Sequence, residues 1–253
     1  MEIVEIEKDI YLYRFAKALG HFVGLNTIVI VNGNKVLLID SGYEENFLEM
    51  KKDLDEKNLE IVGVVVSHFH PDHIGGLKYL KGVSIYGSVY AKHSLEKFNK
   101  EYDHLLPTNI VTEEKVFGFG NHTIKLEKNI GHSKDGILTT IDNKYLYVGD
   151  DMVYSHSGLA LIPFCADQIV ENHLLSIEKI YNEYKGKVII PTHGDIIRDQ
   201  NQIEEDLKNR LIYLNYIIEY PNCTFSEFIK DTGIKFIGEK SHGYNTNKKV
   251  KQW

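Results

Sequence analysis

The sequence SHFHPDHIGG, at residues 67–76, decides how the rest of the chain is interpreted. It follows the apolar run IVGVVV at residues 61–66, which has the form of a short strand buried on both faces. Alternate side chains of an extended segment point to the same side, so His68 and His70 can bind one cation together. The end of this strand is therefore a candidate metal site.

The second half of the same motif carries two further ligand-type residues. Pro71 begins a turn, so Asp72 and His73 leave the alternation of the strand and can reach a neighbouring position. Imidazole nitrogen and carboxylate oxygen are ligands for zinc, iron or manganese. A helix start with solvated polar residues would explain one histidine. It does not explain the pattern His-x-His-x-Asp-His at the end of an apolar strand.

The composition is that of an ordinary globular protein. The 253 residues are 43% hydrophobic and 26% charged, and the formal net charge is −7, which argues against a polyanion-binding surface. The start of the chain has no signal-peptide pattern, and no apolar run approaches the ~18 residues of a membrane helix. Only two cysteines occur, Cys165 and Cys223, so no disulfide framework is expected. A cytoplasmic protein with no nucleic acid and no membrane as partner is the expectation.

Strand-rich segments precede helical segments in both halves of the chain. Strands are predicted at 10–15, 27–33, 34–40, 61–67, 83–88, 122–130, 136–142, 144–150 and 187–193, and helices at 44–57, through Leu77 and Leu80, at 88–98 and at about 168–185. The segment 99–121 has no clear period and is expected to be a loop region. This order predicts an α+β sandwich of two mixed sheets with helices on both outer faces.

The character of the chain changes at about residue 199. An apolar stripe predicts a long amphipathic helix that ends near Pro221; it consists of Ile203, Leu207, Leu211, Leu214 and Ile218. Thr224 and Glu227 have the spacing of a capping box that opens another short helix. The expected organisation is a main domain at 1–198 and a C-terminal helical extension at 199–253. This extension could cover the domain, shape a pocket or form a homodimer.

The histidine motif resembles the His-x-His-x-Asp-His signature of the metallo-β-lactamase superfamily. Three later segments agree with that family's order, each after a predicted strand: NIGHSKDG with His132, LYVGDDMV with Asp150, and VIIPTHGD with His193. The segment LLIDSG, with Asp40 at a strand end, matches a further landmark of the family. The resemblance spans roughly residues 10–195.

The resemblance implies a four-layer αββα sandwich, followed here by C-terminal helices, with two divalent metal ions at one edge of the sheets. Zinc is the expected metal, with iron or manganese as alternatives. The implied ligands are His68, His70 and His132 for the first metal, Asp72, His73 and His193 for the second, and Asp150 as the bridge. Asp72 is also the implied catalytic base, and Asp40 is expected to accept a hydrogen bond from a ligand histidine. The Gly149-Asp150 order selects Asp150 over its neighbour Asp151 as the bridge.

The remaining ligand-type residues are expected to have ordinary roles. His173 is predicted in the core, on the inner face of a helix with Ile169, and Cys165 is predicted to be a small buried hydrophobe. His21, Tyr154 and His156 lie in or beside loops that can reach the rim of a pocket, although a surface role fits each of them equally well.

The absence of a cysteine ligand and of a signal peptide argues against antibiotic hydrolysis. The motif set is more similar to the branch of glyoxalase II enzymes, lactonases and ribonuclease Z. The expected function is hydrolysis of a small-molecule ester, thioester, lactone or phosphodiester by a metal-bridging hydroxide. Two alternatives remain open: a sulfur dioxygenase with a single iron, and a metal-binding sensing module without significant turnover.

Overall fold

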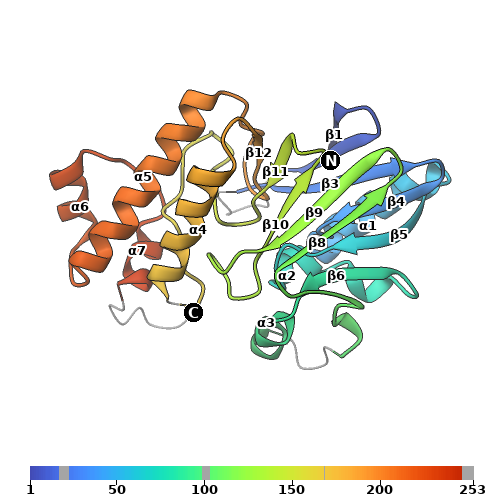
Figure 1. Cartoon of the computed structure of the whole chain (residues 1–253), viewed down its shortest axis with the longest axis horizontal. Helices are drawn as coiled ribbons and strands as arrows, with labels where there is room; N and C mark the ends of the chain where they lie inside the picture. The colour runs from blue at the N-terminus through green and yellow to red at the C-terminus, as the bar shows by residue number, and fades with distance from the viewer. Residues whose placement is uncertain (17–22, 99–102, 168, 247–253) are drawn as a thin grey trace.

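The computed structural model describes residues 1–16, 23–98, 103–167 and 169–246, and its strands form two sheets (Figure 1). The first sheet has the strand order β1-β2-β3-β4-β5-β6-β7. Its strands are β1 (Glu2–Glu7), β2 (Ile10–Phe15), β3 (Leu25–Asn32), β4 (Lys35–Ile39), β5 (Glu60–Val65), β6 (Ser84–Ser88) and β7 (Asn109–Val111). Pairing is antiparallel from β1 to β4 and parallel from β4 to β7, so the sheet is mixed.

The second sheet has five strands in the order β12-β11-β10-β9-β8. They are β8 (Glu114–Phe119), β9 (His122–Lys128), β10 (Ile137–Ile141), β11 (Tyr145–Tyr147) and β12 (Val188–Ile190). All neighbours pair antiparallel except β11 and β12, which are parallel. The predicted turn between β10 and β11 is present, with Asp142 and Asn143 both at positive φ.

Helices cover the two outer faces. On the side of the first sheet lie α1 (Glu44–Glu56), α2 (Pro71–Ile74) and α3 (Ala91–Phe98), with the 3₁₀ turns η1 (Leu77–Tyr79) and η2 (Asp103–Leu105). On the side of the second sheet lie α4 (Val170–Glu183) and α5 (Gln200–Glu219), followed by α6 (Phe225–Thr232) and α7 (Glu239–Asn245) (Figure 1).

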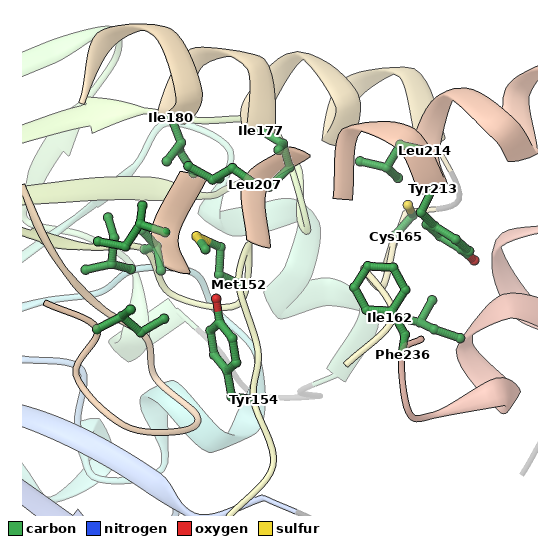
Figure 2. Packing of buried hydrophobic residues seen from close by; sticks show 14 of the residues in the cluster. Met152, Tyr154, Ile162, Cys165, Ile177, Ile180, Leu207, Tyr213, Leu214 and Phe236 are labelled. Carbon is green, nitrogen blue, oxygen red and sulfur yellow. The ribbon is translucent and has the colours of Figure 1, made fainter. Parts of the chain in front are cut away.

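Three hydrophobic clusters separate four layers. One lies between α1 and α3 and the first sheet and includes Phe47 and Leu95; one lies between the sheets and includes Ile28 and Ile141. The third lies between the second sheet and the later helices, where Met152, Ile177, Ile180 and Leu207 meet (Figure 2). The αββα sandwich with C-terminal helices is thereby confirmed.

The C-terminal helices share the third cluster. Side chains of α5 pack against α4, and Figure 1 shows the two helices side by side. Thr224 caps α6 with both bonds of the predicted capping box. The buried positions of α5 differ from the prediction, because Arg210 and Tyr213 are buried, whereas Ile218 is exposed and Leu211 is only partly buried.

Several element predictions were wrong. The segment 103–121 is not a loop region, because it contains β7 and β8. Strand β8 is an edge strand with alternating half-buried and exposed residues, and β7 has only three residues, so neither gives a long apolar run. Strand β1 and helix α7 were not predicted. The predicted helix through Leu77 and Leu80 is instead the short helix α2 followed by the 3₁₀ turn η1. Ile169, predicted on the inner face of a helix, is exposed. Within the described residues, we find no helix that is long and apolar enough to span a bilayer.

Candidate metal centre

The ligand-type residues lie at strand ends that meet at one edge of the sandwich. His68 follows β5, His132 lies between β9 and β10, Asp150 follows β11, and His193 follows β12. The first cluster consists of His68, His70 and His132. Nε2 of His68 lies 3.0 Å from Nδ1 of His70, which lies 3.3 Å from Nε2 of His132. Three imidazole nitrogens therefore face one point, as the alternation of the strand predicts for the first two.

The second cluster consists of Asp72, His73, Asp150 and His193. Oδ2 of Asp72 lies 3.3 Å from Nε2 of His193 and 3.7 Å from Nε2 of His73. Pro71 starts the short helix α2, which turns Asp72 and His73 out of the line of His68 and His70. All seven residues selected from the sequence are thus brought together in two adjacent groups.

Asp150 contacts both clusters. Its Oδ1 lies 3.5 Å from Nε2 of His73 and 3.4 Å from Nε2 of His193, while its Oδ2 lies 3.8 Å from Nε2 of His132. The preceding Gly149 has a φ of 53°, a left-handed conformation that aims the chain toward the clusters. One carboxylate thus presents a different oxygen to each group.

The outer ring nitrogens of the clustered histidines are held by the protein. Nδ1 of His132 donates to the carbonyl of Phe164 at 2.7 Å, and Nδ1 of His193 donates to the carbonyl of Gly24 at 2.6 Å. These bonds fix the proton on Nδ1 and leave the Nε2 lone pair toward the cluster. Neither carbonyl partner has a signal in the sequence, because any residue can supply a backbone oxygen.

Asp40 accepts from Nδ1 of His73 at 2.7 Å, as the resemblance implied. The same carboxylate accepts from the amide of Ser67 at 2.7 Å, from the Ser67 hydroxyl at 2.7 Å and from the Tyr147 hydroxyl at 2.8 Å. Asp40 is fully buried and has a φ of 60°. A buried carboxylate with four donors is held rigidly, so it also fixes the orientation of the His73 ring.

Asp151, the neighbour of Asp150, points away from the two clusters. Asp151 accepts from the backbone amide of His132 at 3.0 Å and from Nδ2 of Asn129 at 2.6 Å. Burial raises the pKa of Asp151 to about 6. The doublet is therefore divided as expected, with Asp150 toward the clusters and Asp151 supporting the His132 backbone.

Asp135 was missed by sequence reasoning. It accepts from the backbone amide of Phe69, between His68 and His70, at 2.8 Å and from the Ser94 hydroxyl at 2.7 Å. Burial raises its pKa. Its place three residues after His132 was the only signal available in the sequence.

The electrostatics of the site reflect a dense group of opposite charges. Burial, followed by the charge of nearby histidines, lowers the pKa of His68 well below its usual value and that of His70 to about 3. Burial opposes ionisation of Asp150, but His193 and His73 outweigh it and lower its pKa well below the usual value. For His73, burial is outweighed by the carboxylates of Asp40, Asp72 and Asp150, which raise its pKa.

The residues present fit bound divalent metals. Nε2 of His73 and Oδ1 of Asp150 are buried and have no hydrogen-bond partner among the described residues, although such buried atoms normally have one. Both atoms point into the second cluster, where a cation would satisfy them. The donors are imidazole nitrogens and carboxylate oxygens, which suit zinc, iron and manganese.

A cavity of about 270 Å³ opens beside the second cluster. Asp72 and His193 lie on its wall together with Phe15, Leu25 and Tyr43. The cavity gives a small molecule access to the clustered carboxylate and imidazole. Glu45 supplies a second carboxylate to the wall of this cavity, besides that of Asp72.

The other ligand-type residues lie outside the clusters. His173 is fully buried, with Nδ1 3.6 Å from Sγ of Cys165, and burial lowers its pKa to about 3. Cys165 is buried as predicted, and His156 is exposed. Tyr154 is buried rather than at the surface, and its hydroxyl donates to Asp206 at 2.9 Å. His21 lies outside the described residues.

Gly75 and Gly76 are explained by packing. A Cβ atom on Gly75 would lie 2.6 Å from the backbone nitrogen of Glu44, and one on Gly76 would lie 2.2 Å from the ring of Phe47. The two glycines therefore allow the histidine segment to approach α1 closely.

Comparisons with known proteins bear on the same part of the chain. The family model described as "Metallo-beta-lactamase superfamily" matches residues 22–196. A "Metallo-beta-lactamase type 2" from Bacillus cereus is 26% identical over 206 residues, which are 78% of this chain and 77% of that protein. An "Atrochrysone carboxyl ACP thioesterase" from Aspergillus fumigatus is 22% identical over 213 residues, which are 81% of this chain and 64% of that protein.

A solved structure supports the fold independently. The "Metallo-beta-lactamase from Pontibacter korlensis" aligns with a TM-score of 0.69 at 19% identity, over 85% of this chain and 98% of that one. At this identity the likeness concerns the fold. The family match at residues 22–196 contains all seven clustered side chains.

Proposed function

The chain belongs to the metallo-β-lactamase superfamily and is a hydrolase of that superfamily, and we propose that it cleaves a small-molecule ester, thioester, lactone or phosphodiester with two bound divalent metals. The proposed ligands are the residues of the two clusters, His68, His70 and His132 on one side and Asp72, His73 and His193 on the other, with Asp150 shared. Zinc is the proposed metal because neutral imidazole and carboxylate are common zinc ligands.

The position of Asp150 is the observation that carries this proposal. Its two oxygens lie 3.4 Å from Nε2 of His193 and 3.8 Å from Nε2 of His132, one toward each cluster. A carboxylate can serve two cations through two oxygens, whereas a neutral imidazole serves one. The geometry thus supports a shared ligand rather than two separate sites.

The residues around the centre have distinct proposed roles. Bound metals would supply an acidified water as nucleophile and a Lewis acid for the scissile group. Asp72 would take the proton of that water, because it lies both in the second cluster and on the cavity wall. Burial opposes its ionisation, but His73 and His193 lower the pKa of Asp72, so it is a free base at neutral pH.

The substrate is proposed to enter through the cavity beside Asp72. Its wall combines the apolar side chains of Phe15 and Leu25 with Tyr43, so it suits a small, partly apolar molecule. Two relatives carry names that denote cleavage of an acyl group, a lactamase and a thioesterase. We therefore place acyl substrates ahead of phosphodiesters. The cytoplasm is the proposed compartment, because Cys165 and Cys223 are buried thiols that are not joined in a disulfide.

A hydrolysis screen of metal-loaded protein tests the proposal. It should contain thioesters, lactones, simple esters, phosphodiesters and a β-lactam, with the same protein after removal of metal as control. Metal-dependent hydrolysis of an acyl substrate is the expected result. If protein that holds one iron consumes oxygen in the presence of a persulfide, the protein is a sulfur dioxygenase rather than the proposed hydrolase. Metal binding without turnover of any substrate would favour a sensing module.

A further inference from the structure

Asn245, the last residue of α7, is a buried polar side chain in contact with the loop between β11 and α4. Its Oδ1 accepts from the backbone amide of Cys165 at 3.0 Å, and its Nδ2 donates to the carbonyl of Pro163 at 2.6 Å. Nδ2 also lies 3.3 Å from the hydroxyl of Tyr213 on α5. Figure 2 shows Tyr213 beside Cys165. Asn245 therefore holds the segment 163–165 against the C-terminal helices.

The peptide group between Phe164 and Cys165 connects this contact to the metal centre. Its N–H donates to Asn245, and its carbonyl oxygen accepts from Nδ1 of His132 at 2.7 Å. A trans peptide group is planar, with its N–H and C=O pointing in opposite directions. When Asn245 holds the N–H, the orientation of the carbonyl toward His132 is fixed as well.

The bond to this carbonyl determines how His132 faces the first cluster. Donation from Nδ1 keeps the proton on that nitrogen and leaves the lone pair on Nε2. Nε2 lies 3.3 Å from Nδ1 of His70 and 3.8 Å from Oδ2 of Asp150. A rotation of the Phe164–Cys165 peptide group would remove the acceptor and free the ring to turn.

We propose that Asn245 is a positioning residue for His132, acting through the Phe164–Cys165 peptide group, and that α7 is thereby part of the support of the metal centre. The inference rests on the proposed metal role of the first cluster. It also goes beyond the family match, which ends at residue 196 and so leaves out α7. Residues that orient metal ligands from outside typically change metal affinity by ~10–100-fold when substituted.

A purely structural role for Asn245 has to be separated from this positioning role. Asn245 satisfies buried polar groups, so its loss would lower stability in either case. The control variant is Phe228→Leu, since Phe228 is fully buried in the same cluster and packs against Tyr213, but its ring has no polar atom that could hold the peptide groups of the segment 163–165. Asn245→Asp is the intermediate variant, because it keeps an oxygen that can accept from the Cys165 amide but replaces the Nδ2 donor to the Pro163 carbonyl with a second oxygen.

The test compares Asn245→Leu, Asn245→Asp, Phe228→Leu and the parent chain by two measurements. The first is the exchange rate of the His132 Nδ1 proton in metal-free, isotope-labelled protein, followed by NMR. The second is the zinc affinity of the first cluster, followed through the His132 ring signals in competition with a chelator. We expect Asn245→Leu to speed the exchange and to weaken zinc binding by ~10–100-fold. Phe228→Leu should lower the melting temperature without either effect, and Asn245→Asp should lie between Asn245→Leu and the parent in both.

The outcomes separate the two claims. Unchanged exchange and unchanged zinc affinity in a folded Asn245→Leu protein would overturn the positioning role, and so would equal effects of Asn245→Leu and Phe228→Leu. If Asn245→Leu does not fold, faster exchange and weaker zinc binding in Asn245→Asp than in Phe228→Leu support the role, and the reverse order overturns it. If the parent chain binds no zinc at all, the proposed function fails, while the exchange of the His132 proton in metal-free protein still decides the role of Asn245.

Discussion

Asp40 and His73 form a fully buried pair in which Nδ1 of the imidazole donates to Oδ2 of the carboxylate at 2.7 Å. The other nitrogen of the same ring, Nε2, points to Asp72 and Asp150 and has no hydrogen-bond partner in the part of the chain that the structure describes. The pair therefore determines which nitrogen of His73 is available to a cation.

Asp40→Asn should weaken the second metal site. Both carboxylate oxygens of Asp40 accept from donors, so an amide in either orientation would place an NH₂ group against a donor. His73 would lose its fixed tautomer, and we expect a ~10–100-fold loss of affinity for the second metal. Equilibrium binding of zinc to a folded Asp40→Asn protein measures this. Parent-like affinity for both metals would show that the pair has no such role.

Asp72→Asn should retain the fold and lose turnover by ~10²–10⁴-fold, because an amide cannot take the proton of the attacking water. The matched control is Glu45→Gln, which removes a second carboxylate from the wall of the same cavity. We expect this control to change kcat little. Steady-state kinetics on the substrate found in the screen provides the comparison. An Asp72→Asn enzyme as active as Glu45→Gln would exclude Asp72 as the base.

The doublet Asp150-Asp151 offers a second matched pair. Asp150→Ala should lower bound metal toward one equivalent, since its two oxygens face the two clusters. Asp151→Ala should keep two equivalents, with at most a ~10–100-fold loss of affinity, because Asp151 contacts the backbone amide of His132 and the Asn129 side chain rather than the clusters. Elemental analysis of both proteins decides the assignment. The reverse pattern would place the bridge on Asp151.

His173 should make the stability of the metal-free protein depend on pH. Burial lowers the pKa of His173 to about 3, so the folded state keeps it neutral while the unfolded chain binds a proton below about 6.5. The contribution of His173 to the free energy of unfolding is therefore fully present above about pH 6.5. It is lost as the pH falls toward 3, by about 1.4 kcal/mol per pH unit.

The variant His173→Leu removes this titration. Between pH 7.5 and pH 5 the parent should lose about 2 kcal/mol more unfolding free energy than the variant, because the other buried histidines are common to both. Urea unfolding at the two pH values, with a chelator present, measures the difference. Equal losses in parent and variant would mean that His173 is protonated in the folded chain.

Much of the candidate metal centre could be predicted because its side chains follow strand ends. His68 and His70 are two apart on an extended segment, and His132, Asp150 and His193 each follow a strand that the sequence predicts. The supporting contacts could not be predicted in the same way. Asn245 and the carbonyl of Phe164 act through backbone groups that are brought together only by the tertiary fold.

The same contrast applies to the fold. The buried strands β3, β4 and β5 were evident from continuous apolar residues, whereas the edge strand β8 alternates too briefly to be separated from a loop. Helix α5 was found, and Ile203, Leu207 and Leu214 are buried as predicted. The rest of its buried stripe was not found, because that part contains Arg210. This guanidinium is buried, and its central carbon lies 4.9 Å from the ring centroid of Tyr154. It donates to the carbonyl of Val153 at 3.3 Å. A charged residue at a core position carries no apolar signal.

The ratio of bound metal to protein tests the central claim most directly. The claim is that seven side chains form two adjoining sites that share Asp150. Protein purified gently, or reconstituted with zinc and freed of excess metal, should contain two equivalents per chain by elemental analysis. A stable ratio of one, unchanged by added zinc or manganese, would contradict the shared site, and a ratio of zero would contradict the metal centre altogether.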